Sequence, residues 1–114
     1  PPVVPEKVEQ ARIVQLLRSL GASVYVLGHP SPSDGRRYHG TGQTPGIPDL
    51  YAFLPRRPGV APAETLWIEV KRQGGAVRPA QRVFEAECWE AGQFHILGTL
   101  DDVQAWLTDE GYLR

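Results

Sequence analysis

The stretch LWIEVKR at residues 66–72 predicts a central β-strand and decides how the rest of the chain is arranged. Successive side chains of a strand point to opposite faces of a sheet, so this stretch has two unlike faces. The apolar face, which we expect to pack on the core, consists of Leu66, Ile68 and Val70. The opposite face consists of Trp67, Glu69 and Lys71. A carboxylate and an ammonium group therefore lie side by side on a strand that is otherwise apolar enough to be central.

A second strand is predicted upstream, at residues 47–54. Here Asp49 shares a face with two aromatic residues, which makes it a lone charge on a largely apolar strand. A buried charge is costly unless it is paired or binds a metal ion. If residues 47–54 and 65–72 form a hairpin, Asp49 and Glu69 meet at the same end of the sheet.

Helical periodicity and turn residues predict the remaining elements. A helix begins at Pro5 and ends at Gly21, because apolar side chains recur every three or four residues between them. A second helix begins at Pro79 and ends at Gly92, and a capping box from Thr99 predicts a short last helix. The other segments are strands at 22–27, 47–54, 65–72 and 94–97, a loop at 28–46 and a turn at 55–64. The order αβββαβ plus a short C-terminal helix predicts an α/β domain, or an α+β sandwich, on one mixed sheet.

Composition limits the class of protein. The chain has 114 residues, of which 41% are hydrophobic and 22% charged, as expected for one globular domain. It has none of the apolar runs of ~18 residues that span a membrane, and its single cysteine excludes a disulfide framework. We therefore expect a cytoplasmic protein without a membrane partner.

The net charge of −1 hides a gradient along the chain. Residues 34–82 hold eight bases and four acids, a net charge of +4, whereas residues 85–114 hold one base and seven acids, a net charge of −6. Ten of the twelve bases are arginine, the side chain that binds phosphate in a bidentate manner. The middle of the chain is thus a candidate face for an anionic partner, with an ordinary solvated surface as the alternative.

Asp49, Glu69 and Lys71 have the chemistry of a hydrolytic metal site. Two converging carboxylates with open water positions suit Mg²⁺, which keeps several of its waters. A lysine beside them can hold or deprotonate a water molecule. Together these groups can hydrolyse a phosphodiester. The alternative is a structural Glu–Lys pair and an isolated Asp at a turn, and local chemistry alone leaves both open.

The complete pattern resembles a known family. GIPDLYAF, then LWIEVKRQGG and RPAQ, are similar to the motifs of the virus-type replication–repair nuclease domain (VRR-NUC), a branch of the PD-(D/E)xK nuclease superfamily. The opening EKVEQARIVQLL, the stretch GTGQTPG and the closing HILGTLDDVQAWL extend the resemblance from Glu6 to about Leu107. The resemblance implies a restriction-endonuclease-like core in a single domain over residues 1–114.

The resemblance also implies roles for individual residues. Asp49 and Glu69 would bind the metal, with the Val70 carbonyl as a third ligand, and Lys71 would position and activate the attacking water. Gln81 would support the site from the second helix. Glu6 matches the family's first-helix acid, although helical geometry alone does not separate it from Glu9.

The candidate DNA-binding residues are Arg36, Arg37, Tyr38, His39, Gln43 and Arg72. We expect His29, His39 and His95 not to be metal ligands, because their spacing is wrong for a metal site. Cys88 lies on the apolar stripe of its helix, so we expect it in the core rather than as a nucleophile. Trp89, Trp106 and Tyr112 fit either the core or a partner surface.

The expected function is that of a Mg²⁺-dependent, structure-specific DNA endonuclease, with Mn²⁺ as a substitute for Mg²⁺. Stand-alone domains of this family resemble homodimeric Holliday-junction resolvases of DNA repair and recombination, which makes branched or junction DNA the expected substrate. The expected setting is a bacterium or a phage-infected host cell. The alternatives are a flap or single-strand nuclease of the same family and a non-catalytic DNA-binding module.

Overall fold

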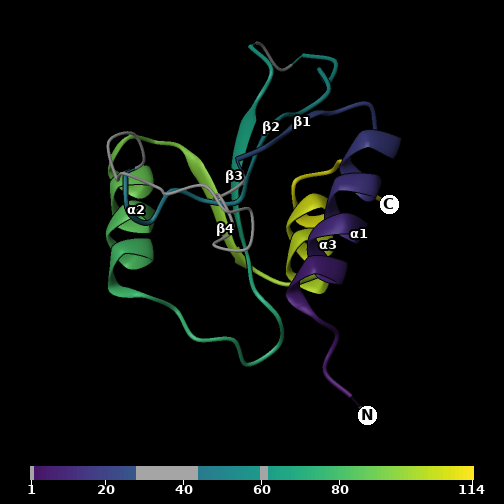
Figure 1. Ribbon diagram of the computed structural model, residues 1–114. Helices are drawn as coiled ribbons and strands as arrows, with labels where there is room; N and C mark the ends of the chain where they lie inside the picture. The colour runs from purple at the N-terminus through teal and green to yellow at the C-terminus, as the bar shows by residue number, and fades with distance from the viewer. Residues whose placement is uncertain (1, 28–43, 60–61) are drawn as a thin grey trace.

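The computed structural model describes residues 2–27, 44–59 and 62–114. Within these ranges the predicted order of helices and strands is confirmed (Figure 1). The elements are α1 (Glu6–Ser19), β1 (Ser23–Val26), β2 (Leu50–Phe53), β3 (Thr65–Val70), α2 (Pro79–Glu90), β4 (Phe94–Gly98) and α3 (Leu100–Asp109). None of these helices is long and apolar enough to cross a membrane.

The four strands form one mixed sheet in the order β1-β2-β3-β4. The β1–β2 and β2–β3 pairs are antiparallel, whereas β4, which follows α2 in the chain, is parallel to β3. Strands β2 and β3 form the antiparallel pair that the meeting of Asp49 and Glu69 requires, with Leu50 opposite Ile68. This register places Asp49 and Glu69 at the same end of the sheet.

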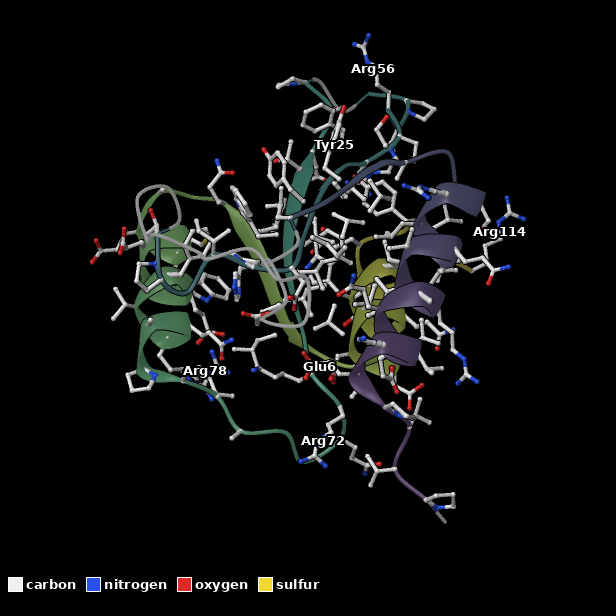
Figure 2. The ribbon with its side chains drawn as sticks, viewed as in Figure 1. Glu6, Tyr25, Arg56, Arg72, Arg78 and Arg114 are labelled. Atoms are coloured by element: carbon white, nitrogen blue, oxygen red, sulfur yellow. The ribbon has the colours of Figure 1, made fainter. Side chains whose placement is uncertain are left out.

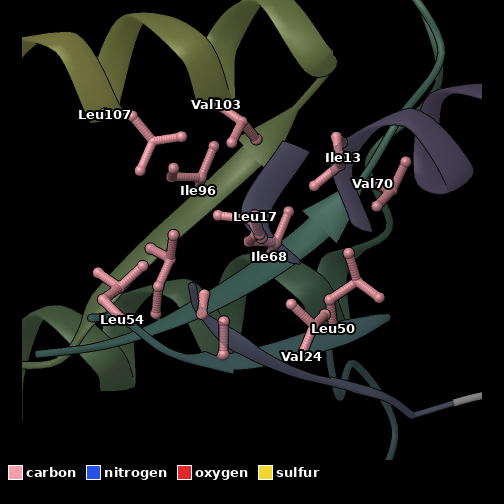
Figure 3. Close-up of a cluster of buried hydrophobic side chains, with 13 residues drawn as sticks. Ile13, Leu17, Val24, Leu50, Leu54, Ile68, Val70, Ile96, Val103 and Leu107 are labelled. Atoms are coloured by element: carbon pink, nitrogen blue, oxygen red, sulfur yellow. The ribbon is translucent and has the colours of Figure 1, made fainter. Parts of the chain in front are cut away.

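The sheet has helices on both faces. Helices α1 and α3 lie side by side on one face, and α2 lies alone on the other (Figure 1). The core fills the space between the sheet and the α1–α3 pair (Figure 3). Its fully buried strand residues include the predicted apolar face of β3, namely Leu66, Ile68 and Val70. The opposite face of the sheet, toward α2, therefore carries Glu69.

The second strand is shorter than the sequence pattern predicts. It begins at Leu50 rather than at residue 47, because Pro48 has no N–H to extend the ladder. Pro48 is fully buried and Asp49 follows it immediately before the strand. The third strand likewise ends at Val70, one residue before Lys71. Asp49 and Lys71 thus lie at strand ends, where side chains face a rim of the sheet rather than its middle.

A close backbone contact fixes the segment that leads into β2. Gly46 has a φ angle of +85°, and a Cβ atom there would lie 2.2 Å from the carbonyl oxygen of Ala80. Only glycine allows both this backbone conformation and this approach. The contact holds the segment before Asp49 against the first turn of α2, which carries Gln81.

Candidate active site

The two predicted carboxylates come together at the end of the β2–β3 hairpin. Asp49 is half-buried, and its Oδ2 accepts a hydrogen bond of 2.9 Å from the backbone N–H of Val70. Glu69 is only 4% exposed. The backbone of β3 therefore orients Asp49 toward Glu69 on the face of the sheet that α2 covers.

Gln81 links Glu69 to the start of α2. Its Oε1 accepts a hydrogen bond of 2.9 Å from the backbone N–H of Arg78, and its Nε2 donates one of 2.6 Å to Glu69 Oε1. The first bond satisfies one of the free N–H groups at a helix N-terminus. It also fixes the orientation of the amide, because the oxygen is used for capping and only the NH₂ group is left for Glu69. The predicted supporting residue is thus in direct contact with a predicted metal ligand.

The environment of Glu69 disfavours its negative charge. The pKa of Glu69 is raised from 4.5 to about 9, mainly by burial and also by a hydrogen bond with Asp49 and the Asp49 charge, while Lys71 and Gln81 partly oppose the rise. A carboxylate pair of this kind is stabilised by a bound cation, which offsets both the desolvation and the mutual repulsion. The donor set therefore fits a hard divalent cation with oxygen ligands.

Lys71 lies at the boundary between this carboxylate pair and an open cavity. Its side chain is nearly buried, at 9% exposure, and its backbone N–H donates to the Gly98 carbonyl at 2.7 Å. The Lys71 charge acts on Glu69, as the pKa of Glu69 shows. Lys71 also lines a cavity of about 530 Å³ together with Arg72 and Glu9. Asp101 and Asp102 line the same cavity, so its wall carries charges of both signs.

The two first-helix acids occupy different environments. Glu6 is exposed in the first turn of α1, and Figure 2 shows it on the side of the helix toward the middle of the molecule. Glu9 is buried, and its Oε2 accepts a hydrogen bond of 2.7 Å from the backbone N–H of Leu100. Glu9 therefore caps the start of α3. Glu6 has no such structural contact among the hydrogen bonds of the described chain, and its role as the first-helix acid stays a prediction.

The predicted DNA-binding residues fall mostly in the segment before β2. Arg72 is exposed at the edge of the cavity, one residue beyond Lys71. Five of the six lie outside the described residues: Arg36, Arg37, Tyr38, His39 and Gln43. His29 lies outside them as well, whereas the His95 side chain is 1% exposed beside α2. Cys88 is buried, and burial raises the pKa of its thiol, with Glu87 and Glu85 adding to the rise.

Two contributors to the site were not predicted. Arg78 provides the backbone N–H that orients Gln81, and Gly46 allows the segment before Asp49 to reach α2. A glutamine three residues after a helix N-cap is a known capping signal, but arginine is not a usual N-cap residue. The φ requirement at Gly46 depends on a tertiary contact and has no local signal.

The site as described has a pair of converging carboxylates, a lysine and a glutamine at one end of a mixed sheet. In the ranges 2–27, 44–59 and 62–114, no three His, Cys, Asp or Glu side chains converge into a metal-binding group. Two carboxylates are sufficient for Mg²⁺, which is commonly held by one or two carboxylates and several waters. Comparison of the chain with known protein families, curated proteins and solved structures finds no match.

Proposed function

We propose that this chain is a metal-dependent DNA endonuclease with a restriction-endonuclease-like core, of the VRR-NUC type. The observation that carries the proposal is the pair of adjoining carboxylates, of which Glu69 is buried and Asp49 is half-buried. Asp49 is oriented by the Val70 N–H, and Glu69 by Gln81, so that two acids adjoin where burial disfavours charge. At a purely structural position we would expect non-ionisable side chains in place of these two acids, since burying an ionisable group costs stability.

Asp49 and Glu69 would hold a Mg²⁺ or Mn²⁺ ion, with the Val70 carbonyl as the proposed third protein ligand. When bound, the ion supplies positive charge against the negative charge that develops on the phosphate during hydrolysis. The protein groups around it are fixed before substrate arrives, because Gln81 is itself held by the Arg78 N–H. Such preorganisation avoids the cost of ordering the ligands during the reaction.

Lys71 is the residue we assign to the attacking water. Lys71 lines the cavity, and its charge is close enough to Glu69 to lower the pKa of that carboxyl group. From this place it donates hydrogen bonds to a water or to a phosphate oxygen. Either use promotes attack on phosphorus: the first orients the water and the second neutralises the phosphate.

Titration calorimetry with Mg²⁺ and with Mn²⁺ tests the metal site. We expect the intact protein to bind metal and Asp49→Ala or Glu69→Ala to weaken binding at least tenfold. Glu87→Gln, on the exposed face of α2, is the matched control and should bind metal as the wild type does. If the intact protein bound no metal, with or without DNA, the non-catalytic DNA-binding module would be the better proposal.

For the substrate, we propose branched DNA cut by a homodimer, as in Holliday-junction resolution. A symmetric dimer presents two active sites related by a two-fold axis, which suits two matched cuts in a four-way junction. Light scattering at micromolar concentration tests this directly. A mass equal to two chains agrees with junction resolution, and the mass of one chain counts against it.

A further inference from the structure

The face of the sheet that carries the carboxylates also carries a row of aromatic side chains. The row consists of Tyr25, Tyr51, Phe53 and Trp67, and we call it the aromatic row. Tyr25 is opposite Tyr51, which is opposite Trp67, so the row crosses three strands. Ring centroids are separated by 4.2 Å for Tyr51–Trp67, 5.6 Å for Tyr51–Phe53 and 5.2 Å for Tyr25–Phe53. The rings are in continuous contact.

The aromatic row is covered at one end and exposed at the other. Phe84 of α2 packs edge-on against Trp67, with centroids 5.1 Å apart. Away from α2, Tyr25 is 48% exposed and Phe53 is 44% exposed. Large aromatic side chains normally bury most of their surface. Their exposure beside one another indicates a surface that another molecule covers.

The aromatic row is continuous with the candidate active site at Trp67 and Tyr51. Trp67 precedes Glu69 by two residues on β3, and Tyr51 follows Asp49 by two residues on β2. Alternate residues of a strand are about 7 Å apart on one face. A chain lying along this face from the carboxylates would therefore contact Trp67 and Tyr51 first and Phe53 and Tyr25 next.

The charge of this face permits an anionic strand. Away from the carboxylates, the aromatic row is flanked by Ser23 and Thr65, which pair with Phe53 and are uncharged. Among the strand residues of this face that the structure describes, Glu69 is the only acid. The exposed Arg56 follows β2, and Figure 2 shows it at the same end of the molecule as Tyr25. Arg56 thus provides an exposed positive charge at this end of the molecule.

We propose that the aromatic row binds unpaired nucleotides of the DNA strand that the site cuts. This inference rests on the proposed nuclease function and names its substrate class, which is DNA with a single-stranded segment at the point of cleavage. Base–aromatic stacking tolerates any sequence, because every base has a π-face. Paired bases within a duplex are already stacked and do not present those faces. The aromatic row therefore prefers unpaired DNA to intact duplex. Such DNA includes single-stranded arms, flaps and base pairs that have opened at a branch point.

Binding without cleavage tests the aromatic row separately from catalysis. We would measure fluorescence anisotropy of a labelled oligothymidylate and of a duplex of equal length, with EDTA present. For the Tyr25→Ala/Phe53→Ala double variant we expect the affinity for the single strand to fall roughly tenfold or more, since each stacked base contributes measurably. Affinity for the duplex should change less than threefold.

Two single substitutions distinguish stacking from general apolar packing. Phe53→Leu keeps an apolar side chain and removes the ring, so it should lose most of the effect of Phe53 on the single strand. Phe53→Trp keeps a ring and should bind as the wild type does. Because Phe53 is nearly half exposed, both variants are expected to fold, which circular dichroism and thermal unfolding would verify.

The outcomes separate this inference from the proposed function. The inference would be overturned if Phe53→Leu or the double variant bound the single strand with wild-type affinity. It would also be overturned if the wild type did not bind single strands. A double variant that changes from dimer to monomer and binds single strands normally would show that a second copy covers the aromatic row. If single-strand binding depends on the rings but no DNA is cleaved with Mg²⁺ or Mn²⁺, the inference about the aromatic row is supported and the nuclease proposal fails.

Discussion

Replacing Glu69 with glutamine should stabilise the metal-free protein, although it removes a proposed metal ligand. The pKa of Glu69 is about 9 in the folded state against 4.5 for an ordinary glutamate. At pH 7 folding therefore requires Glu69 to take up a proton, which at 1.36 kcal/mol per pH unit costs roughly 3 kcal/mol. Glutamine is neutral in both states and has no such cost.

The amide of Glu69→Gln can also keep the contacts of the protonated acid. Its oxygen can accept the hydrogen bond from Gln81, and its NH₂ group can donate to Asp49 as the protonated acid does. Little packing is therefore lost. The expected gain of about 3 kcal/mol at pH 7 corresponds to an increase in Tm on the order of 10 °C for a domain of this size.

The pH dependence gives the sign of the effect. The pKa of Glu69 is higher in the folded state than in the unfolded state, so protonated Glu69 favours folding. Its contribution to stability is fully present below pH 4.5 and is lost as the pH rises through about 9. Urea unfolding in EDTA at pH 5, 6, 7 and 8 should show a difference between wild type and Glu69→Gln that widens with pH. Glu87→Gln, an exposed glutamate of α2, is the control. Parallel curves for wild type and Glu69→Gln would refute the reasoning.

Three further predictions concern the surroundings of the site. Gln81→Ala should weaken Mg²⁺ binding by about tenfold, as loss of outer-shell hydrogen bonds does. An unchanged calorimetric titration would contradict this. Gly46→Ala should cost about 2 kcal/mol or more in urea unfolding, because a Cβ at φ +85° would meet the Ala80 carbonyl, and a loss under 0.5 kcal/mol would be inconsistent with that contact. Burial lowers the pKa of His95, and the Glu85 charge opposes only part of this decrease. The folded state therefore favours neutral His95, and this contribution to stability is present above pH 6.5 and is lost as the pH falls below that value. His95→Gln should flatten the acid side of the stability curve, and an unchanged slope below pH 6.5 would argue against this assignment.

The order of elements was predictable because it depends on local signals. Proline and glycine at the helix ends and alternation in the strands defined α1, α2 and β3 to within a few residues. Alternation also assigned Leu50 and Ile68 to the core faces of their strands, and the structure pairs these two residues in the hairpin. Asp49 and Glu69 were brought together by that register. The restriction-endonuclease-like core and the VRR-NUC family stay predictions.

The remaining features depend on tertiary contacts that the sequence pattern does not contain. Glu6 and Glu9 border the same apolar stripe of α1, and only the position of α3 leaves Glu9 buried against Leu100. From the sequence, Trp89 and Trp106 could each lie in the core or on a partner surface. The structure leaves Trp89 exposed on α2, whereas Trp106 packs against Phe94.

The exposed end of the aromatic row was likewise unpredictable. Strand alternation placed Tyr51 and Phe53 on the face of Asp49, but it did not indicate which part of that face α2 covers. The helix packs against β4, and its Phe84 contacts Trp67 of β3, whereas Phe53 remains 44% exposed. The length and position of one helix thus decide which rings are buried.

Cleavage of end-labelled DNA tests the central claim most directly. The protein would be incubated with Mg²⁺ and four substrates, namely a four-way junction, a flap, a linear duplex and a single strand, alongside EDTA and Glu69→Ala controls. We predict Mg²⁺-dependent cleavage of a branched or single-stranded substrate that both controls abolish. Paired symmetric cuts would identify a junction resolvase, and cuts in the flap or single strand would identify a nuclease for unpaired DNA. No cleavage of any substrate, with Mn²⁺ as well as Mg²⁺, would contradict the nuclease function.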